Sequence, residues 1–446
     1  MIKKVLVANR GEIAVRIIRA CREMGIETVA VYSQADEEAL HTQLADEAIC
    51  IGPAQSSESY LNMEQIISAT LVSGADAIHP GFGFLSENSK FVELCEKCNI
   101  TFIGPSSEVI QKMGNKAQAR RTMIEAGVPV IPGSKEAVRD VSHGAEIAEE
   151  IGYPVMIKAA LGGGGKGMRV AETRETFAAS FQKAQKEAQM AFGDGTMYLE
   201  RFVRNPRHIE FQILADCYGN AIHLGERDCS IQRNHQKMIE ESPSAVIDEE
   251  LRSRMGQAAV QAAKAAGYTN AGTIEFLLER DGQFYFMEMN TRIQVEHPVT
   301  EWVTGIDLIQ EQIRIASGLP LSYRQEDIKL SGHAIECRIN AENPDKNFRP
   351  SPGTITDLYL PGGKGVRIDT AIYSGYTVPA YYDSMLAKLI VHADTREQAI
   401  SKMRTALGEV IIEGIDTNID YQYEIMNHPD YQSGKIDIEF ISKWQR

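Results

Sequence analysis

The stretch Pro154-Val-Met-Ile-Lys-Ala-Ala-Leu-Gly-Gly-Gly-Gly-Lys-Gly-Met-Arg-Val-Ala171 decides how the middle of the chain should fold. Its ends are strand-like, and its five glycines let the backbone approach phosphate oxygens closely and point N–H groups at them. Gly162, Gly164 and Gly167 match G-x-G-x-x-G, but Met168–Ala171 resembles a strand where a dinucleotide-binding fold needs a helix. A Walker A motif is excluded because no Lys follows the last glycine. The layout predicts a flexible flap over ATP, with a surface hairpin as the alternative.

A second cluster of polar residues lies on both sides of a strong hairpin signal at Asp281-Gly282. A two-residue turn there pairs Arg280 with Gln283 and places Glu275 directly opposite Glu288. The Cβ atoms of such a pair lie about 5 Å apart.

Two carboxylates this close on apolar strands repel each other unless a cation lies between them. Magnesium prefers carboxylates together with phosphate oxygens, so we expect Glu275 and Glu288 to bind it. Asn290 falls on the same strand face as Glu288 and could share the ion. A solvated pair of glutamates is the alternative.

Polar residues continue this face beyond the hairpin. If the chain stays extended, Arg292, Gln294 and Glu296 share it. An Arg fork binds a planar oxyanion, and a neighbouring carboxylate can act as a base, so we expect a site for bicarbonate or a carboxylate. His208 and the run Gln232–Lys237 add cations nearby in the sequence, although each could also be ordinary surface charge.

Residues 1 to about 112 alternate short apolar strands with amphipathic helices. The predicted strands are Val5–Ala8, Thr28–Tyr32, Ala48–Ile51, Asp76–Ile78 and Thr101–Ile103. Between the first two, Ile13, Ile17, Cys21 and Met24 form one helical stripe that ends at Gly25. This alternation predicts an α/β fold with a doubly wound parallel sheet.

Beyond the first 112 residues the pattern is mixed. We expect a polar connection at residues 134–150, a second segment from Tyr153 to Leu319, and a third from about Gly332. In the third segment we predict strands at Ala334–Ile339 and Thr354–Leu360 and a last helix at Glu397–Leu407.

The composition excludes several classes of protein. Of 446 residues, 43% are hydrophobic, which is typical of a folded soluble protein, and the net charge of −15 repels nucleic acid and anionic membranes. The sequence begins without the apolar segment of a signal peptide, and no run reaches the 18 apolar residues of a membrane span, so we expect a cytoplasmic protein.

The seven cysteines are an odd number and mostly scattered, so we expect reduced thiols. Cys95 and Cys98 form a single C-x-x-C pair. Because a second such pair is missing, ordinary helix residues are favoured over a redox pair or half of a zinc site.

These motifs, in this order, resemble the ATP-grasp enzymes and, more narrowly, the biotin carboxylase family. The resemblance covers essentially the whole chain. Its elements are Ala8-Asn-Arg-Gly-Glu-Ile-Ala, His79-Pro-Gly, Lys116, Lys158 with its glycine loop, Glu200-Arg-Phe-Val203, His208, His235-Gln-Lys237, Glu275, Glu288-Met-Asn-Thr-Arg-Ile-Gln-Val-Glu296-His-Pro, Glu336-Cys-Arg338 and Tyr381-Tyr-Asp-Ser-Met.

The resemblance implies three domains: an α/β amino-terminal domain (1–114), an ATP-grasp domain (115–331) with a mobile lid at about 132–203, and an α+β carboxyl-terminal domain (332–446). It also implies the role of each site residue. Those that bind ATP are Lys116, Lys158, Gly164, Gly165, Glu200, Arg201, Phe202, Val203, His208, Gln232, His235, Glu275 and Glu288. Glu275, Glu288 and Asn290 bind Mg2+ or Mn2+; Lys237, Arg292, Gln294 and the Val295 backbone bind bicarbonate; Glu296 is the base; Arg338 stabilises the biotin enolate.

The implied activity is the first half-reaction of acetyl-CoA carboxylase in fatty acid synthesis. In that reaction, ATP and bicarbonate carboxylate biotin through carboxyphosphate. An Ala-Met-Lys-Met biotinylation motif is missing from the sequence, so we expect the biotin on a separate carboxyl carrier protein, with separate carboxyltransferase subunits and a homodimer. The alternatives are a subunit of a pyruvate or acyl-CoA carboxylase, another ATP-grasp ligase, or an ATP sensor. Two positions depart from the family pattern: Phe82, where Tyr is common, and Asn234, where Arg is common.

Overall fold

The computed structural model describes residues 2–134, 136–159 and 167–444. They fall into two compact parts, which are described separately. The larger part comprises Met1–Val128, Arg207–Phe276 and Glu288–Arg446; the smaller part comprises Pro129–Pro206 and Leu277–Met287. No helix in the described ranges combines the length and apolar character that a membrane span requires.

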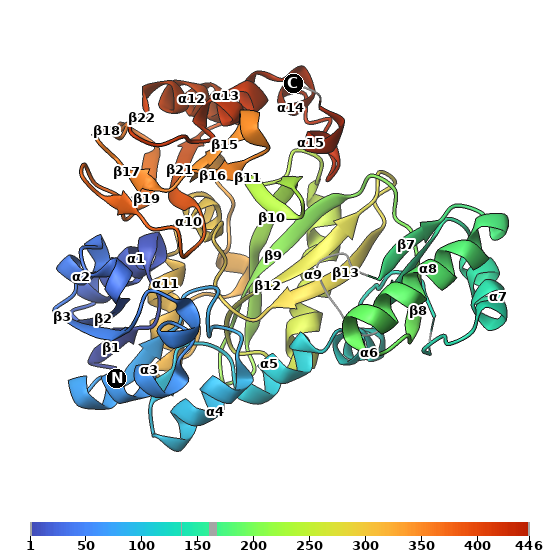
Figure 1. The fold of residues 1–446 in the computed structure, drawn as a ribbon, viewed down its shortest axis with the longest axis horizontal. Coiled ribbons are helices and arrows are strands. Elements are labelled where there is room, and N and C mark those ends of the chain that lie inside the picture. The colour runs from blue at the N-terminus through green and yellow to red at the C-terminus, as the bar shows by residue number, and fades with distance from the viewer. Residues whose placement is uncertain (1, 135, 160–166, 445–446) are drawn as a thin grey trace. The chain divides into compact units, whose positions relative to one another are not determined.

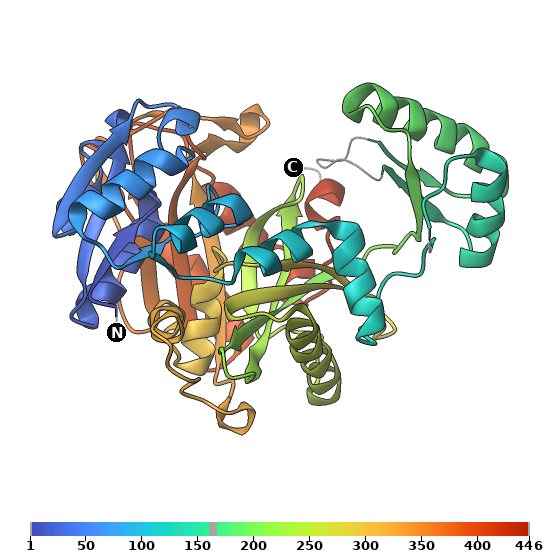
Figure 2. The same ribbon diagram turned by 90° about the horizontal axis from the view of Figure 1, so that it is seen from below.

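The larger part begins with a five-stranded parallel sheet, as predicted. In sheet order its strands are β3 (Glu47–Gly52), β2 (Glu27–Ser33), β1 (Lys4–Val7), β4 (Ala77–His79) and β5 (Thr101–Phe102). Because side chains alternate along β1, Val5 and Val7 pack with helix α1 (Gly11–Glu23), whereas Leu6 packs with α3 (Met63–Ser73) and α4 (Ser89–Lys97). Figures 1 and 2 show these blue strands with helices around them, which confirms the doubly wound sheet.

The C-x-x-C pair lies at the end of α4. Cys95 is fully buried in the core that α4 forms with the sheet, and Cys98 caps the helix. Both thiols are free, and burial raises the pKa of Cys95 to about 12. A thiol this hard to ionise is a poor nucleophile or metal ligand, which supports the prediction that Cys95 is an ordinary helix residue.

The larger part also holds most of an eight-stranded sheet. In sheet order its strands are β13 (Phe284–Asn290), β12 (Asn270–Leu278), β9 (Arg207–Ala215), β10 (Ala221–Arg233), β11 (Gln236–Ser242), β14 (His333–Asn340), β21 (Met385–Ala393) and β19 (Val366–Thr370). β11 pairs directly with β14. The sheet therefore runs across residue 331, where the sequence predicts a domain boundary, and residues from both sides can meet in one site.

Helices cover both faces of the β14–β21 region. Ile335 and Cys337 point toward α12 (Arg396–Glu409) and α13 (Ile419–Asn427), whereas Ala334 and Ile390 pack with α10 (His297–Thr304). The remaining helices of the larger part are α2 (Leu40–Leu44), α5 (Ser107–Gly114), α6 (Lys116–Glu125), α9 (Glu249–Ala266), α11 (Leu308–Ala316), α14 (Pro429–Gln432) and α15 (Phe440–Lys443).

Two sequence predictions for the carboxyl-terminal region are wrong. Glu397–Leu407 is not the last helix, because α13, α14 and α15 follow; they are too short to show a clear periodicity. The single strand predicted at Thr354–Leu360 is two strands, because its halves pair with different partners. β17 (Gly353–Thr354) pairs with β20 (Thr377–Val378), and β18 (Leu358–Tyr359) with β22 (Ile411–Ile412). A further short pair joins β15 (Glu342–Asn343) to β16 (Arg349–Pro350).

A fully buried lysine ties the first helix to the carboxyl-terminal strands. Lys388 Nζ on β21 lies 3.1 Å from Glu12 Oε2 on α1 and 3.7 Å from Asp369 Oδ2 on β19. The same ammonium donates to the carbonyl oxygen of Val295 at 2.9 Å. The loop that precedes α10 is thereby fixed to the sheet by a charged hydrogen bond.

The smaller part contains a three-stranded antiparallel sheet of β7 (Met168–Ala171), β6 (Val155–Ala159) and β8 (Met197–Arg201). The predicted strand pair around the glycine loop is confirmed, while the loop itself, with Gly164 and Gly165, lies outside the described residues. The segment 134–150, predicted as a connection, contains most of α7 (Val141–Ile151), whose first turn is capped by Asp140. Helix α8 (Arg174–Phe192) completes this part.

The core of the smaller part allows a test of whether this part unfolds independently of the larger part. Phe181 on α8 is fully buried among Ile157, Leu199 and Phe177. Replacing Phe181 by Ala should cost about 3–5 kcal/mol of this part's free energy of unfolding. Hydrogen exchange should accelerate in β6, β7 and β8, while exchange in β9 and β10 stays slow.

The exposed Lys183 on the same helix provides the control, because Lys183→Ala should change stability by less than about 0.5 kcal/mol. If hydrogen exchange in the Phe181→Ala variant accelerated in β9 and β10 as much as in β6, β7 and β8, the two parts would unfold as one.

Candidate active site

Lys237 is the centre of a buried charged cluster in the larger part. Its ammonium lies 2.5 Å from Glu210 Oε2 on β9, 2.8 Å from Glu275 Oε1 on β12 and 2.7 Å from Glu296 Oε1, just before α10. Burial disfavours the charged lysine, but the three carboxylates outweigh it and raise the pKa of Lys237 well above its usual value. Lys237 is therefore charged, and three separate elements converge on it.

Arg227 on β10 lies behind this cluster and has no exposed surface. Its Nε donates to Glu210, and its four remaining N–H groups are all bonded. Their acceptors are Gln212 at 2.7 Å, Thr300 at 3.0 Å, Thr273 at 3.1 Å and Gln294 at 2.7 Å. All five donors of a guanidinium are used, so Arg227 fixes the positions of its neighbours.

Arg227 and Glu210 are not among the site residues predicted from the sequence. A signal was available, because Glu210, Gln212 and Thr273 alternate with large apolar residues along β9 and β12. Polar residues that repeat every second position inside an otherwise apolar strand indicate a buried polar face.

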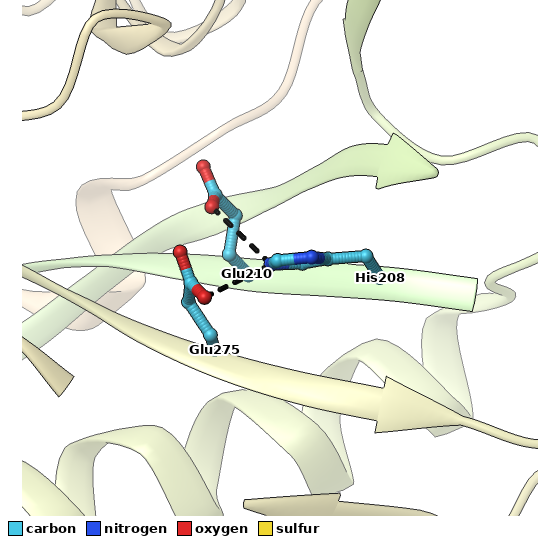
Figure 3. Close-up of side chains that lie close together, drawn as sticks. All are labelled: His208, Glu210 and Glu275. Carbon is cyan, nitrogen blue, oxygen red and sulfur yellow. Dashed lines mark ion pairs between the residues drawn. The ribbon is translucent and has the colours of Figure 1, made fainter. Parts of the chain in front are cut away.

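His208 extends the cluster along β9. Figure 3 shows the Glu210 and Glu275 carboxylates directed at its ring, with His208 Nε2 4.0 Å from Glu210 Oε2 and 3.1 Å from Glu275 Oε2. Burial opposes protonation, yet the Glu275 charge outweighs it and raises the pKa of His208. These three side chains lie close enough to share a metal ion. Both carboxylates already face Lys237, however, so their charge is compensated without one.

The predicted hairpin turn is wrong by one residue. Glu279 N donates to Gln283 O at 2.8 Å and Gly282 N to Glu279 O at 3.1 Å, which is a three-residue loop with Gly282 at φ 82°. Such loops end in a left-handed residue and a bulge, and the extra residue removes the expected pairing of Arg280 with Gln283. The two-residue turn on which the predicted pairing of Glu275 with Glu288 depended is therefore not the turn that forms.

Glu275, Glu288 and Asn290 nevertheless lie near one another. Asn290 Nδ2 donates to Glu275 Oε1 at 2.8 Å. Within the described chain Glu288 has no ion pair or hydrogen bond, and burial, followed by the charge of Glu275, raises its pKa. A half-buried carboxylate without a direct ion pair, beside two further oxygen ligands, suits a hard divalent cation.

Glu296, the predicted base, lies between two cations. Its Oε1 is 2.7 Å from Lys237 Nζ, and its Oε2 accepts from Arg338 on β14 at 3.0 Å. Burial alone would raise its pKa, but Lys237 and then Arg338 hold the pKa of Glu296 far below its usual value. Glu296 is therefore a carboxylate at any physiological pH.

Arg292 occupies a different position from the one its spacing predicts. Its Nε donates to Glu87 Oε2 at 2.9 Å, and the Thr291 N–H holds the other oxygen of Glu87. The chain leaves β13 at Asn290 and is no longer extended, so Arg292 and Glu296 have separate partners. Gln294 instead donates to Glu275 at 3.0 Å. Glu87 was missed because it lies 205 residues from Arg292 in the sequence.

The other predicted residues are distributed over both parts. In the larger part, Lys116 begins α6, Gln232 lies on β10, and His235 follows Asn234 in the turn between β10 and β11. Asn234 has φ 51°, a conformation that Asn tolerates better than most residues do, which accounts for its presence in this turn.

In the smaller part, Lys158 on β6 forms an ion pair with Glu200 on β8. Arg201 bonds Glu279 and donates to the Tyr285 hydroxyl at 2.7 Å, while Val203, just after Phe202, packs with Ile131 and Tyr285. The segment Glu200–Val203, which the resemblance assigns to ATP binding, thus has partners within the smaller part.

Three family models match consecutive segments of the chain. They describe the biotin carboxylase N-terminal domain (residues 1–110), the carbamoyl-phosphate synthase L chain ATP-binding domain (115–324) and the biotin carboxylase C-terminal domain (336–443). The chain is 59% identical to biotin carboxylase 1 of Bacillus subtilis over 100% of its own length and 99% of that protein.

Solved structures lead to the same family as the family models and the sequence relative. A biotin carboxylase complex from Campylobacter jejuni has a TM-score of 0.94 at 53% identity, over 100% of this chain and 99% of that one. The biotin carboxylase domain dimer of Hydrogenobacter thermophilus 2-oxoglutarate carboxylase, solved with ADP, magnesium and bicarbonate, has a TM-score of 0.91 at 51% identity, over 99% and 98%. With sequence, fold and family models in agreement over the full length, the chain belongs to the biotin carboxylase family.

Proposed function

We propose that this chain is a ligase that carboxylates biotin on a separate carrier protein, using ATP and bicarbonate. The observation that carries the proposal is Glu296, a buried carboxylate held between Lys237 and Arg338. A base flanked by two cations suits a reaction in which a small anion is bound, deprotonated and transferred. An ATP sensor would need neither the base nor the cations.

Bicarbonate binding is assigned to Lys237 and Arg292, with Gln294 and the Val295 backbone beside them. Arg292 is half-exposed and held by Glu87, an ion pair of modest strength that an incoming planar anion can replace. Lys237 already faces three carboxylates, so an anion beside it displaces one of these contacts. The displaced partner is most simply Glu296, because the substrate must reach that residue.

The same displacement makes Glu296 a competent base. While Lys237 and Arg338 hold its carboxylate, its proton affinity is very low. When bicarbonate takes over the charge of Lys237, the pKa of Glu296 rises toward its ordinary value and proton transfer becomes feasible. The deprotonated bicarbonate then attacks the γ-phosphate of ATP, and ADP leaves as carboxyphosphate forms.

Glu275, Glu288 and Asn290 are the proposed ligands for magnesium or manganese. The bound cation would neutralise charge that develops on the phosphates. Within the described chain the Glu288 side chain forms no ion pair, and burial and the charge of Glu275 raise its pKa although Lys116 opposes this, so Glu288 gains most from the cation.

The proposed ATP ligands are those that the resemblance implies. In the larger part they are Lys116, His208, Gln232, His235, Glu275 and Glu288, and in the smaller part Lys158 and Glu200–Val203. Gly164 and Gly165, which lie outside the described residues, belong to the proposal as ATP ligands. The lid at about 132–203 is proposed from the resemblance. The three-domain division at residues 114 and 331 is likewise proposed from the resemblance.

Arg338 is assigned to the second step, in which carboxyphosphate delivers its carboxyl group to the ureido nitrogen of biotin. Arg338 lies on β14, and its guanidinium donates to both Glu296 and Glu240, so it is already held within the site. A cation in this place stabilises the negative oxygen of the biotin enolate.

The proposed setting is a cytoplasmic homodimer that works with a biotin carboxyl carrier protein and carboxyltransferase subunits. The proposed complex is acetyl-CoA carboxylase, and the proposed pathway is fatty acid synthesis. The carboxylase of another acceptor, such as pyruvate or an acyl-CoA, is the alternative. Identifying the biotinylated protein that co-purifies with the chain distinguishes these assignments.

Acceptor specificity tests the proposed reaction. Purified chain should release phosphate from ATP in the presence of bicarbonate, and free biotin should stimulate that release. Ammonia and amino acids should not stimulate it, because the site holds a base and anion-binding cations for bicarbonate. Stimulation by ammonia alone would assign the chain to a different ATP-grasp reaction.

Replacing Glu296 and Arg338 in separate variants should distinguish the formation of carboxyphosphate from the carboxylation of biotin. Glu296→Gln should lower both bicarbonate-dependent phosphate release and biotin carboxylation at least about 100-fold, because no other positioned group takes the proton. Arg338→Met should lower carboxylation by a similar factor but leave much of the bicarbonate-dependent phosphate release. Phosphate release and incorporation of radiolabelled bicarbonate are measured in parallel at one pH.

The exposed ion pair of Arg324 and Glu326 supplies matched controls, since Arg324→Met and Glu326→Gln remove the same groups from the surface. Both should behave like the unmodified chain. A Glu296→Gln variant with near-normal phosphate release would place the base elsewhere.

The metal ligands can be tested by titration. Glu288→Gln removes the negative charge of a proposed ligand and should lower turnover about 10-fold or more even at saturating magnesium. Lys97→Gln, an exposed change on α4, should leave the magnesium dependence unaltered. Turnover within threefold of the unmodified chain for Glu288→Gln would exclude Glu288 as an essential ligand.

A further inference from the structure

Two buried glutamates lie directly behind Arg338 and have no role in the proposed reaction. Glu240 on β11 and Glu336 on β14 are both fully buried. They are paired in register across the two antiparallel strands, so their side chains point to the same face, with Cβ atoms about 5 Å apart. Arg338, two residues beyond Glu336, shares that face.

Three of the four carboxylate oxygens of this pair have no partner. Glu240 Oε1 accepts from Arg338 Nε at 2.6 Å, but Glu240 Oε2 and both oxygens of Glu336 lack a hydrogen-bond partner among the described residues. A buried carboxylate without hydrogen bonds is very unfavourable, whereas a protonated carboxyl can donate to a neighbouring carboxylate and satisfy both groups.

The surrounding cations cannot neutralise both glutamates. Arg338 is shared with Glu296 at 3.0 Å, and Lys388 is shared among Glu12, Asp369 and the Val295 carbonyl. The charged and titratable groups that face the pair or lie beside it are Arg338 and Cys337 on β14, Lys388 on β21, Lys237 on β11, Cys229 on β10 and Glu296 before α10.

The pKa shifts of Glu240 and Glu336 agree with their missing hydrogen-bond partners. Burial raises the pKa of Glu240 to about 7, although the nearby Arg338 opposes this. Burial raises the pKa of Glu336 well above its usual value, although Lys388 opposes this, and the charge of Glu240 adds to the rise. Two interacting carboxyls of this kind titrate as a pair.

We propose that Glu336 holds a proton and donates it as a hydrogen bond to Glu240, so that the pair presents one negative charge to Arg338. That single charge anchors the Nε and Nη2 atoms of Arg338, and Nη2 also donates to Glu296. Glu240 and Glu336 are thus positioning residues for Arg338. Their catalytic consequence rests on the proposed function, but the shared proton does not.

Infrared difference spectroscopy tests the shared proton without any turnover. At neutral pH the unmodified chain should show the C=O stretching band of a protonated carboxyl, and Glu336→Gln should abolish that band. Glu241→Gln is the matched control, because ion pairs with His333 and Arg396 lower the pKa of the adjacent Glu241 to about 2, although burial opposes this. Its replacement should leave the band in place.

A band that survives in Glu336→Gln, or its absence from the unmodified chain at neutral pH, would overturn the proposal. The result is independent of carboxylation, so a chain that shows the band but does not carboxylate biotin would contradict the proposed function alone.

Kinetics test the positioning of Arg338. An amide at 240 cannot supply the negative charge that Arg338 requires, whereas an amide at 336 can still donate a hydrogen bond to Glu240. Glu240→Gln should therefore impair biotin carboxylation, through a higher KM for biotin or a lower rate, about tenfold more than Glu336→Gln does. Its effect on bicarbonate-dependent phosphate release should be smaller than its effect on carboxylation. Equal effects of the two variants, or the reverse order, would contradict the assigned positioning.

Discussion

The whole site depends on one ammonium that faces three carboxylates. Lys237 lies within 2.8 Å of Glu210, Glu275 and Glu296, which come from two strands and from the loop before α10. Buried charges of one sign are tolerated only where an opposite charge and good hydrogen bonds accompany them, so Lys237 allows these acids to coexist. Each carboxylate then faces a second partner, namely Arg227 for Glu210, His208 for Glu275 and Arg338 for Glu296. A cluster this closely balanced responds strongly to an incoming anion.

The fold explains why the cluster holds its geometry. Strands β9 to β12 and β14 belong to one continuous sheet, so the polar face crosses the border between the middle and carboxyl-terminal segments. Arg227 joins the strands to α10 through Thr300, and Lys388 fixes the Val295 carbonyl beside the base. The predicted base therefore lies on a loop with rigid attachments. Preorganised charges of this kind lower a reaction barrier because they need no rearrangement at the moment of reaction.

The sequence predicted what depends on local pattern. The parallel strands, the stripe of α1 and the β6–β7 pair all appear as expected, because period and turn chemistry are local properties. The predicted hairpin turn was wrong by one residue, since Gly282 admits a three-residue loop as readily as a two-residue turn. Glu87 was missed for another reason: its partner Arg292 is far away in the sequence, and no spacing reveals such a contact. For Arg227, only the alternating polar residues on β9 and β12 indicated a buried polar face. The Glu240–Glu336 pair likewise depends on a strand pairing that only the fold supplies.

Oxygen transfer tests the central chemical claim most directly. If Glu296 activates bicarbonate to attack ATP, an oxygen atom of bicarbonate must become part of the phosphate that is released. Heavy-oxygen-labelled bicarbonate should therefore yield inorganic phosphate that carries one labelled oxygen, as read by mass spectrometry, in the presence of ATP, magnesium and biotin. Phosphate that takes its new oxygen only from water, while biotin is still carboxylated, would contradict attack by bicarbonate on the γ-phosphate and with it the role assigned to this site.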